Sequence, residues 1–539
     1  RHSMFSSSAG PGGVLWLQPV KRRRRRRRRA PIGPILFVVA LLALAGGAYA
    51  VVRVRDQGED PSRAIAQRFA DAWARGDLDG AWRLTTARTQ AEQPLAGFKE
   101  SYRQATRAAT VTAVRVGRAA EPRDGRVSVP VVLRTRVFGE QRGTIAFPVE
   151  RTGATARVAW SPELRLPGLR AGERVQRRTL RQPRRASVLD ADGRRLSRTS
   201  SAAALVDGLE QRYKERLGGR PGAELRYGRR VIAKVDLVPG RSVRTTIRPA
   251  LQGAATTALG DRLGGVAVVR PRNGDVLALA GLAVSGPQPP GSSFKIVTLA
   301  GALQAGVTEP GESFPVQTAA TLEGVKLRNA GDEACGGSLT QSFANSCNSV
   351  FGPLGARLGA RRLVRIAEAF GFNEKLPIPD FKPSTIPHEL ADDLAVGASA
   401  IGQDRDLATP LTMASVGATI ANRGVRHRPR LVRSEPREHS RVVKPGVAAA
   451  VRDMMLAVVR SGTGTAAALP GVEVAGKTGT AELVPTADAA SDPANTDAWF
   501  VAFAPASSAD IAVAVMLVGA GHGGDSAAPI ARDVLAAGI

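Results

Sequence analysis

Two apolar periodicities follow each other between residues 61 and 160. In Pro61 to Arg75 large apolar residues recur every four positions, which predicts a helix with Ser62 as its N-cap and Gly76 as its end; they are Ile65, Phe69 and Trp73. The next apolar runs are short and predict strands at 110–116, 127–133, 144–149 and 156–160. A helix followed by four strands predicts a small α+β domain over residues 53–160.

The C-terminal half carries a second set of apolar runs. Gly264 to Ala278 predicts a hairpin, because two apolar runs meet at Asn273-Gly274, a dipeptide that favours hairpin turns. Three further runs predict strands, at 472–476, 498–503 and 511–518. A run beginning at Phe294 is apolar enough for a buried helix that starts near Gly291.

One long apolar stretch lies near the N-terminus. Residues 32–52 comprise 21 uncharged residues, and as a helix they would extend roughly 31 Å, against about 30 Å for a bilayer core. The basic block Lys21 to Arg29 precedes it and predicts a cytoplasmic N-terminus. We therefore expect a basic cytoplasmic tail at 1–30, a single-pass anchor at 31–52 in the cell membrane, and the remaining chain outside. A cleaved signal peptide is the open alternative, since Ala48-Tyr49-Ala50 resembles a processing site.

Charge and composition narrow the class of partner. The formal net charge is +29, with 66 arginines and 10 lysines. Residues 1–30 carry ten of the positive charges, so the rest of the chain has 66 − 47 = +19. Such a surface suits an acidic polymer or anionic lipid headgroups. No nucleic-acid-binding motif accompanies it and aromatic residues make up only 4%, so no nucleic-acid partner is predicted.

The clearest chemical signal is Ser292-Ser293-Phe294-Lys295. Lys295 is the only lysine with a serine three residues before it. On a helix these two side chains share a face, and burial would lower the lysine pKa so that a neutral amine can take the serine proton. Alone, the segment fits equally a serine and a lysine on a solvated helix face.

Two weaker motifs follow in order. Ser346-Cys347-Asn348 lies in a turn-like stretch that can present Ser346 to shuttle a proton and Asn348 to bind a substrate amide; its ordinary interpretation is a capping turn. Lys477-Thr478-Gly479-Thr480 follows an extended run. Lys477, Thr478 and Thr480 can bind a carboxylate, and Gly479 permits a close backbone approach. An edge strand with a protective lysine is the competing interpretation.

Together these motifs resemble the transpeptidase domain of a class B penicillin-binding protein. The resemblance covers residues 244–539, where the three motifs are spaced by 51 residues (Lys295 to Ser346) and 129 residues (Asn348 to Lys477). Ala400-Ile401-Gly402-Gln403 and the stretch 460–466 also match the family. Residues 53–160 resemble the NTF2-like domain that precedes some of these enzymes, and 161–243 resemble its linker or pedestal. The implied fold class is multidomain α+β, ending in a serine β-lactamase-like α/β domain with a central antiparallel sheet.

The resemblance implies a penicillin-binding peptidoglycan D,D-transpeptidase that needs no cofactor. Ser292 would form an acyl-enzyme at D-Ala-D-Ala of a stem peptide, with the backbone N–H groups of Ser292 and Thr480 as the oxyanion hole. Lys295, Ser346, Asn348 and Lys477 would complete the catalytic set. The implied partners are stem peptides, β-lactam antibiotics and a polytopic glycosyltransferase. A β-lactamase or D,D-carboxypeptidase, and a non-catalytic β-lactam sensor, are the alternatives.

The two cysteines and five histidines add little chemistry. Cys335 and Cys347 are 12 residues apart in a domain expected to face an oxidising space, so a disulfide is permitted, and the sequence leaves bonded and free thiols open. The histidines have no metal-ligand spacing, and no metal site is predicted.

Overall fold

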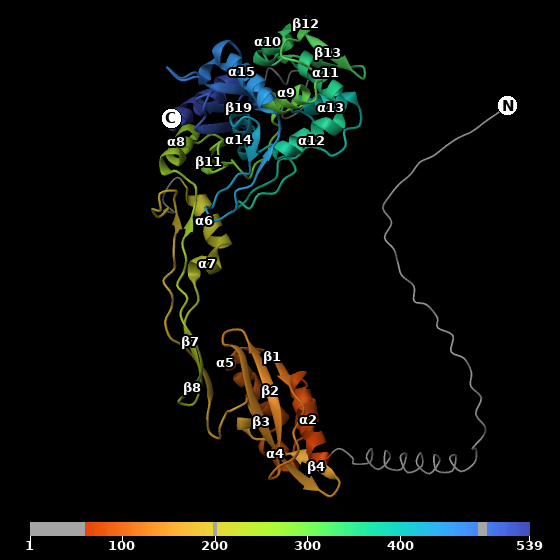
Figure 1. Ribbon diagram of the computed structural model, residues 1–539, viewed down its shortest axis with the longest axis vertical. Coiled ribbons are helices and arrows are strands. Elements are labelled where there is room, and N and C mark those ends of the chain that lie inside the picture. Colours follow the sequence, from red (N-terminus) through yellow and green to blue (C-terminus); the bar gives the residue numbers. More distant parts are fainter. Residues whose placement is uncertain (1–59, 198–201, 483–492) are drawn as a thin grey trace, which may run out of the picture. The chain divides into compact units, whose positions relative to one another are not determined.

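The computed structural model describes residues 60–197, 202–482 and 493–539, which are organised in two compact units (Figure 1). The described part of the first unit consists of residues 60–177 and 225–233, and the second unit contains 178–224 and 234–539. The stretch predicted as a linker or pedestal, 161–243, is thus divided between the two units. The segment predicted as a membrane anchor, 31–52, lies outside the described residues. Within the described residues, no helix is both long enough and apolar enough to cross a membrane.

The first unit is built from short helices and one antiparallel sheet, as the sequence pattern predicts. Its helices are α2 (Pro61–Ala74), α3 (Leu78–Arg83), α4 (Ala87–Glu92) and α5 (Leu95–Ala109), with a 3₁₀ turn at Pro162–Arg165. Its sheet has the order β1-β2-β3-β4, with β1 (Val111–Val116), β2 (Arg126–Thr135), β3 (Gly139–Thr152) and β4 (Thr155–Val158). The four strands were predicted, whereas α3, α4 and α5 were not.

The start of α2 corrects one prediction. Asp60, not Ser62, is the N-cap: its carboxylate accepts the backbone N–H of Ser62 at 2.7 Å. Pro61 is the reason, because proline favours the first helical position and so places the cap one residue before itself. The predicted apolar stripe does face the core, where Phe69 packs against Phe147 of β3 with ring centroids 5.2 Å apart.

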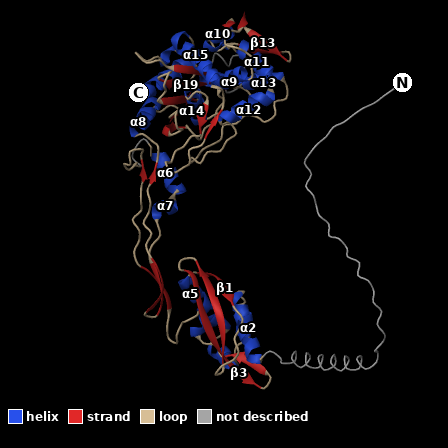
Figure 2. Ribbon diagram, viewed as in Figure 1, coloured by secondary structure: helices blue, strands red, loops and turns tan. Residues whose placement is uncertain are grey.

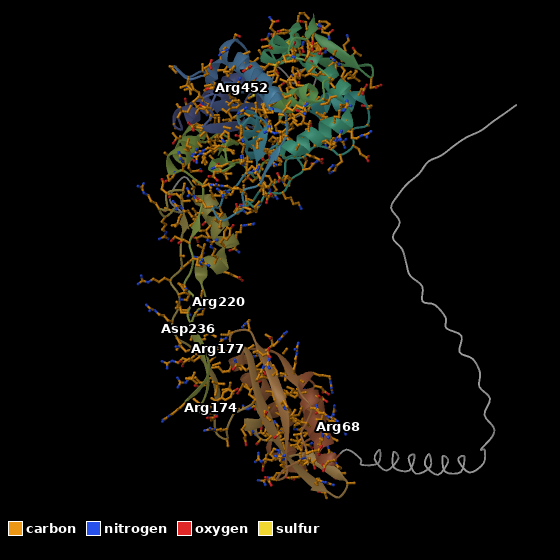
Figure 3. The ribbon with its side chains drawn as sticks, in the orientation of Figure 1. Arg68, Arg174, Arg177, Arg220, Asp236 and Arg452 are labelled. Carbon is orange, nitrogen blue, oxygen red and sulfur yellow. A yellow bond between two sulfur atoms is a disulfide. The ribbon has the colours of Figure 1, made fainter. Side chains whose placement is uncertain are left out.

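Small elements follow between residues 175 and 244. They are β5 (Val175–Thr179), β6 (Val188–Leu189), α6 (Ala203–Arg212), α7 (Lys214–Gly218), β7 (Ala223–Tyr227), β8 (Arg230–Val235) and β9 (Val243–Arg244). Strands β5, β7 and β8 form one sheet, and β6 pairs with β9 in parallel. Much of the positive charge is on the surface: Figure 3 shows Arg174, Arg177 and Arg220, all exposed, beside these strands and helices.

A five-stranded antiparallel sheet forms the centre of the second unit (Figure 2). Its order is β11-β10-β20-β19-β18, with β10 (Gly264–Val269), β11 (Val276–Gly281), β18 (Ala475–Glu482), β19 (Thr496–Ala504) and β20 (Ile511–Leu517). This confirms the predicted central antiparallel sheet. Strand β18 is at one edge, so one side of its backbone pairs with β19 while the other side is not paired with a strand of this sheet.

Helices bury both faces of this sheet. Along β20, Ile511, Val513 and Val515 pack with α8 (Pro249–Leu259) and α16 (Gly523–Ala536), whereas Ala512 and Ala514 pack with α14 (Pro410–Ala421) on the opposite face. Successive side chains of a strand point to opposite faces, so a strand buried on both sides must be apolar throughout, as β20 is.

The remaining elements surround the motif residues. The helices are α9 (Lys295–Gln304), α10 (Leu339–Ala344), α11 (Asn348–Leu358), α12 (Ala360–Phe370), α13 (Asp393–Ala400) and α15 (Pro445–Ser461). The short strands pair as β12 (Ser313–Gln317) with β15 (Cys335–Ser338), β13 (Ala319–Leu322) with β14 (Val325–Arg328), and β16 (Val425–His427) with β17 (His439–Arg441).

Candidate active site

Ser292 lies in a short 3₁₀ turn, Gly291–Phe294, that leads directly into α9. In a 3₁₀ turn residues i and i+3 are eclipsed, so Ser292 and Lys295 project from the same side, as predicted for a helix. Gly291 has φ +52° and donates its N–H to the Gly402 carbonyl at 2.9 Å. A Cβ on Gly291 would lie 2.4 Å from the carbonyl oxygen of Thr480. Only glycine therefore lets this turn sit against β18.

Lys295 is completely buried, and its amine binds the second motif. Its Nζ donates to the Ser346 carbonyl at 2.7 Å, to Asn348 Oδ1 at 2.6 Å and to Ser346 Oγ at 3.2 Å. The face of the Phe351 ring lies beneath the amine, with the ring centroid 5.7 Å from Nζ. The structure thus brings the first and second motifs together.

Ser346 occupies the connection between α10 and α11 in a left-handed backbone conformation, φ +62°. Such a conformation is costly for a residue other than glycine and is common at functional sites. Here it places Ser346 Oγ between two amines, since Lys477 Nζ donates to the same oxygen at 2.9 Å. A single hydroxyl therefore links Lys295 to Lys477.

Lys477 comes from β18 and is also completely buried. Its Nζ contacts the carbonyl oxygen of Thr478 at 3.1 Å and lies 5.5 Å from the centroid of the Phe343 ring. Burial lowers the pKa of Lys477 to about 7. Burial and then the nearby charge of Lys477 hold the pKa of Lys295 well below its usual range. Both shifts favour the neutral form of each amine.

Ser292 Oγ has no hydrogen-bond partner among residues 60–197, 202–482 and 493–539. Its hydroxyl is free to rotate, and Lys295 sits on the same side of the turn.

The third motif also meets a residue that the sequence did not identify as part of the site. Thr463 Oγ1 lies 2.6 Å from Thr478 Oγ1 and donates to the Ala344 carbonyl at 3.3 Å. Thr463 belongs to the stretch 460–466, which matches the family, but the sequence pattern predicts no role for this residue. The hydroxyls of Thr463 and Thr478 form one pair.

The edge of β18 that does not pair with β19 faces the turn that carries Ser292. The Thr480 carbonyl points at Gly291, away from β19, and the N–H of an antiparallel strand residue points the same way as its carbonyl. Gly479 permits this approach, because a Cβ there would lie 2.8 Å from the Pro290 carbonyl and 3.0 Å from the Ser293 nitrogen. The Thr480 N–H therefore points toward the turn that carries Ser292, whose own N–H lies in the first turn of its helix.

Cys335 and Cys347 form a disulfide in the structure, with Cα atoms 5.4 Å apart. Cys347 lies between Ser346 and Asn348 and caps the start of α11, while Cys335 begins β15. Among the residues described here, no group of three histidine, cysteine, aspartate or glutamate side chains is placed to hold a metal ion.

Comparison with known proteins shows which family the chain resembles. Residues 264–536 match the family described as the penicillin-binding protein transpeptidase domain. The peptidoglycan D,D-transpeptidase PbpA of Mycolicibacterium smegmatis (strain ATCC 700084 / mc(2)155) is 35% identical over 407 residues, covering 62% of this chain and 79% of that protein. The crystal structure of PBPA from Mycobacterium tuberculosis is 31% identical with a TM-score of 0.51, covering 61% of this chain and 86% of that one. The penicillin G acyl-enzyme complex of penicillin-binding protein A from M. tuberculosis is 29% identical with a TM-score of 0.52, covering 65% and 90%.

The chain therefore belongs to the penicillin-binding protein transpeptidase family.

Proposed function

We propose that this protein is a penicillin-binding peptidoglycan D,D-transpeptidase that works through an acyl-enzyme on Ser292. One observation carries the proposal: two buried amines, Lys295 and Lys477, share the Ser346 hydroxyl, and Lys295 lies one turn from Ser292, whose hydroxyl has no hydrogen-bond partner in the described part of the chain. The names of the relatives, and acyl-enzyme structures of one of them, support the same chemistry.

Lys295 acts as the base in the first step. With a neutral amine, two N–H groups donate to the Ser346 carbonyl and to Asn348 Oδ1, and one lone pair remains to accept the Ser292 proton. Ser292 Oγ then attacks the carbonyl carbon between the two D-alanines, forming the C–O bond as the proton moves to Lys295.

Ser346 returns a proton to the leaving group. The Ser346 oxygen accepts a hydrogen bond from Lys477, which leaves the Ser346 hydroxyl hydrogen available for transfer to the leaving group. The protonated Lys295 then donates a proton to the Ser346 oxygen and restores the hydroxyl. The C–N bond breaks, the departing D-alanine takes up the proton at its amine, and the acyl group stays on Ser292. An amine from a second stem peptide attacks the ester by the reverse sequence of proton transfers, which releases Ser292 and closes the cross-link.

The backbone N–H groups of Ser292 and Thr480 stabilise the negative charge on the carbonyl oxygen in both steps. The open edge of β18 binds the extended stem peptide through main-chain hydrogen bonds. Asn348 accepts from Lys295 and donates to the Arg328 carbonyl, which orients Lys295, and its second amide N–H remains to hydrogen-bond a substrate amide. The Thr463–Thr478 hydroxyl pair, with Thr480 and Lys477, binds the terminal carboxylate.

Replacing the nucleophile tests the proposal. Ser292→Ala should abolish covalent labelling by a fluorescent penicillin and leave the melting temperature nearly unchanged, because a partly exposed hydroxyl with no hydrogen bond contributes little stability. The matched control is Ser293→Ala, since the Ser293 hydroxyl is buried and donates to the Pro290 carbonyl at 2.7 Å. Labelling that persists in Ser292→Ala would refute the assignment.

We further propose that residues 31–52 anchor the enzyme in the cell membrane with the catalytic unit outside, and that an NTF2-like domain follows. Support comes from the apolar stretch and basic block of the sequence, and from the helices and four-stranded sheet of residues 60–165. A polytopic glycosyltransferase is the proposed source of the glycan strands. Protease added to spheroplasts should degrade the chain from Arg53 onward; a mature N-terminus at Val51 would instead establish a cleaved signal peptide.

A further inference from the structure

Asn329 is a buried polar residue whose side chain uses its hydrogen-bonding groups to join three segments. It is 6% exposed. Its Nδ2 donates to the carbonyls of Gln317 at 2.8 Å and Glu333 at 3.0 Å, and its Oδ1 accepts the Ser349 N–H at 2.8 Å. Both donors and one acceptor site of the amide are satisfied, which fixes its orientation. The residue at the start of α11 is thereby attached to the loop that follows β14.

The residue before it makes the adjoining contact. The Arg328 carbonyl accepts Asn348 Nδ2 at 2.8 Å. A carboxamide has its nitrogen and oxygen on opposite sides, so this bond turns Asn348 Oδ1 toward Lys295, where it accepts Nζ at 2.6 Å. Residues 328 and 329 therefore hold the consecutive residues Asn348 and Ser349.

A second connection joins the same two stretches of chain. The disulfide links Cys347 to Cys335, and Ser349 Oγ donates to the Cys335 carbonyl at 3.3 Å. Every hydrogen bond that Lys295 Nζ makes within the described residues goes to Ser346 or Asn348. The position of the amine relative to Ser292 thus depends on where the stretch 346–349 is held.

From these contacts we propose that Asn329 is a positioning residue for the acylation step. It fixes Ser349 and, with the Arg328 carbonyl, the Asn348 amide that orients the Lys295 amine toward Ser292. The role rests on the proposed function of Lys295 as the base, and it assigns the segment 317–335, remote from the three sequence motifs, to the catalytic geometry.

The test compares Asn329→Ala with the parent in the full-length, detergent-solubilised protein. The readouts are the melting temperature and the second-order rate constant of acylation by a chromogenic cephalosporin, measured across pH. Displacing the amine should lower the rate constant by roughly 10²-fold, the cost of a small misplacement of a reacting group. The acidic limb of the pH–rate profile should move to lower pH. Asn348 Oδ1 accepts from Lys295 and favours its charged form, so weakening this hydrogen bond lowers the pKa of Lys295. Lys477 is the titratable group that faces Lys295, and it is unchanged in this variant.

Asn373 provides a matched control, because its side chain makes an equivalent set of bonds elsewhere in the same unit. Its Nδ2 donates to the Ile386 carbonyl at 3.1 Å and to Glu368 Oε1 at 3.2 Å, and its Oδ1 accepts the Ile386 N–H at 3.2 Å. Asn373→Ala should lower the melting temperature while the acidic limb stays where it is in the parent. If Asn329→Ala does not fold, Asn329→Ser serves in its place because it retains a small hydrogen-bond acceptor. Its acylation rate constant and the position of its acidic limb should lie between those of the parent and those expected for Asn329→Ala.

The outcomes separate the inference from the proposed function. An unmoved acidic limb in both Asn329 variants, with rate losses no larger than in Asn373→Ala, would overturn the positioning role. The proposed function fails separately, through labelling that survives in Ser292→Ala.

Discussion

The two buried lysines have different surroundings, and this difference sets the expected pH dependence of acylation. Lys295 has three oxygen acceptors yet is pushed toward neutrality by burial and by the charge of Lys477. Lys477 has a pKa of about 7 that results from burial. Protonation of Lys295 removes the base, so acylation should decline as the medium becomes acidic.

Lys477→Met removes the like charge while keeping an unbranched side chain of similar length. The pKa of Lys295 should then rise, since the repulsion that disfavours its charged form is gone. Lys295 would then become neutral only at a higher pH, so the acidic limb of the acylation profile should move to higher pH. The plateau rate should also fall, because the hydrogen bond from Lys477 to Ser346 is lost. Stopped-flow acylation across pH measures both; a limb that stays in place would show that the two amines do not interact.

At the residue level, the sequence predicted the residues of the three motifs, but not the residues that hold these motifs in place. The burial of Lys295 and the lowering of its pKa followed from an apolar helix around a single Ser-x-x-Lys. Thr463 and Asn329 could not be found this way, because each acts through backbone carbonyls, Ala344 and Gln317, that folding brings near. Thr and Asn are common in loops, and only these contacts distinguish Thr463 and Asn329 from ordinary loop residues.

Among the elements, the turn that carries Ser292 depends on a second turn at Gly402. Gly402 has φ +75°, and a Cβ there would lie 2.1 Å from the Gly291 carbonyl oxygen. Gly402→Ala should therefore displace the nucleophile turn and lower the acylation rate by roughly 10²-fold or more. Gly306→Ala is the control: it also has positive φ, with open space around a Cβ, so it should cost stability with normal acylation. Equal acylation rates in the two variants would contradict this account.

The disulfide is the second element-level feature to test. It closes a short loop beside Ser346, and the chain-entropy estimate gives it about 2–3 kcal/mol of stability. Cys335→Ser with Cys347→Ser should lower the denaturation midpoint accordingly and slow acylation, since one connection to the 346–348 turn is gone. Mass spectrometry of unreduced, alkylated protein should find no free thiol; two alkylated cysteines would contradict the bond.

Strands such as β19 and β20 were predicted because each is a short apolar run bounded by polar or turn residues. The strand predicted at 472–476 was misplaced: β18 is Ala475–Glu482, and its polar residues Lys477, Thr478 and Thr480 hide it from an apolar pattern.

The helices α3 and α4 were missed because each has only six residues with few apolar positions, and their starts depend on the caps Asp77 and Thr86. Helix α5 was missed although Phe98, Tyr102, Ala105 and Ala109 recur at helical spacing, and no side-chain cap marks its start at Pro94. The pairing of strands far apart in sequence, such as β10 with β20, is not contained in local periodicity, and the family resemblance implied only that a central antiparallel sheet exists.

For the whole molecule, the central antiparallel sheet and the order of the motifs were predictable, whereas the division into compact units was not. The first unit takes in residues 225–233, which return to it after the chain has entered the second. Local composition cannot reveal such a return, because strands β7 and β8 resemble any two short strands.

The central claim is that Ser292 forms an acyl-enzyme whose natural acceptor is an amine rather than water. The most direct measurement is the lifetime of the penicillin adduct, followed by intact-protein mass spectrometry and peptide mapping of the purified full-length chain. Hydrolysis at an ordinary enzyme rate, roughly 10 per second, would leave no adduct to observe, whereas a transpeptidase should release it at about 10⁻⁴ per second. We predict one penicilloyl group on Ser292 that persists for many minutes in buffer. Rapid repeated hydrolysis of a chromogenic cephalosporin, with no adduct accumulating, would contradict the account in favour of a β-lactamase.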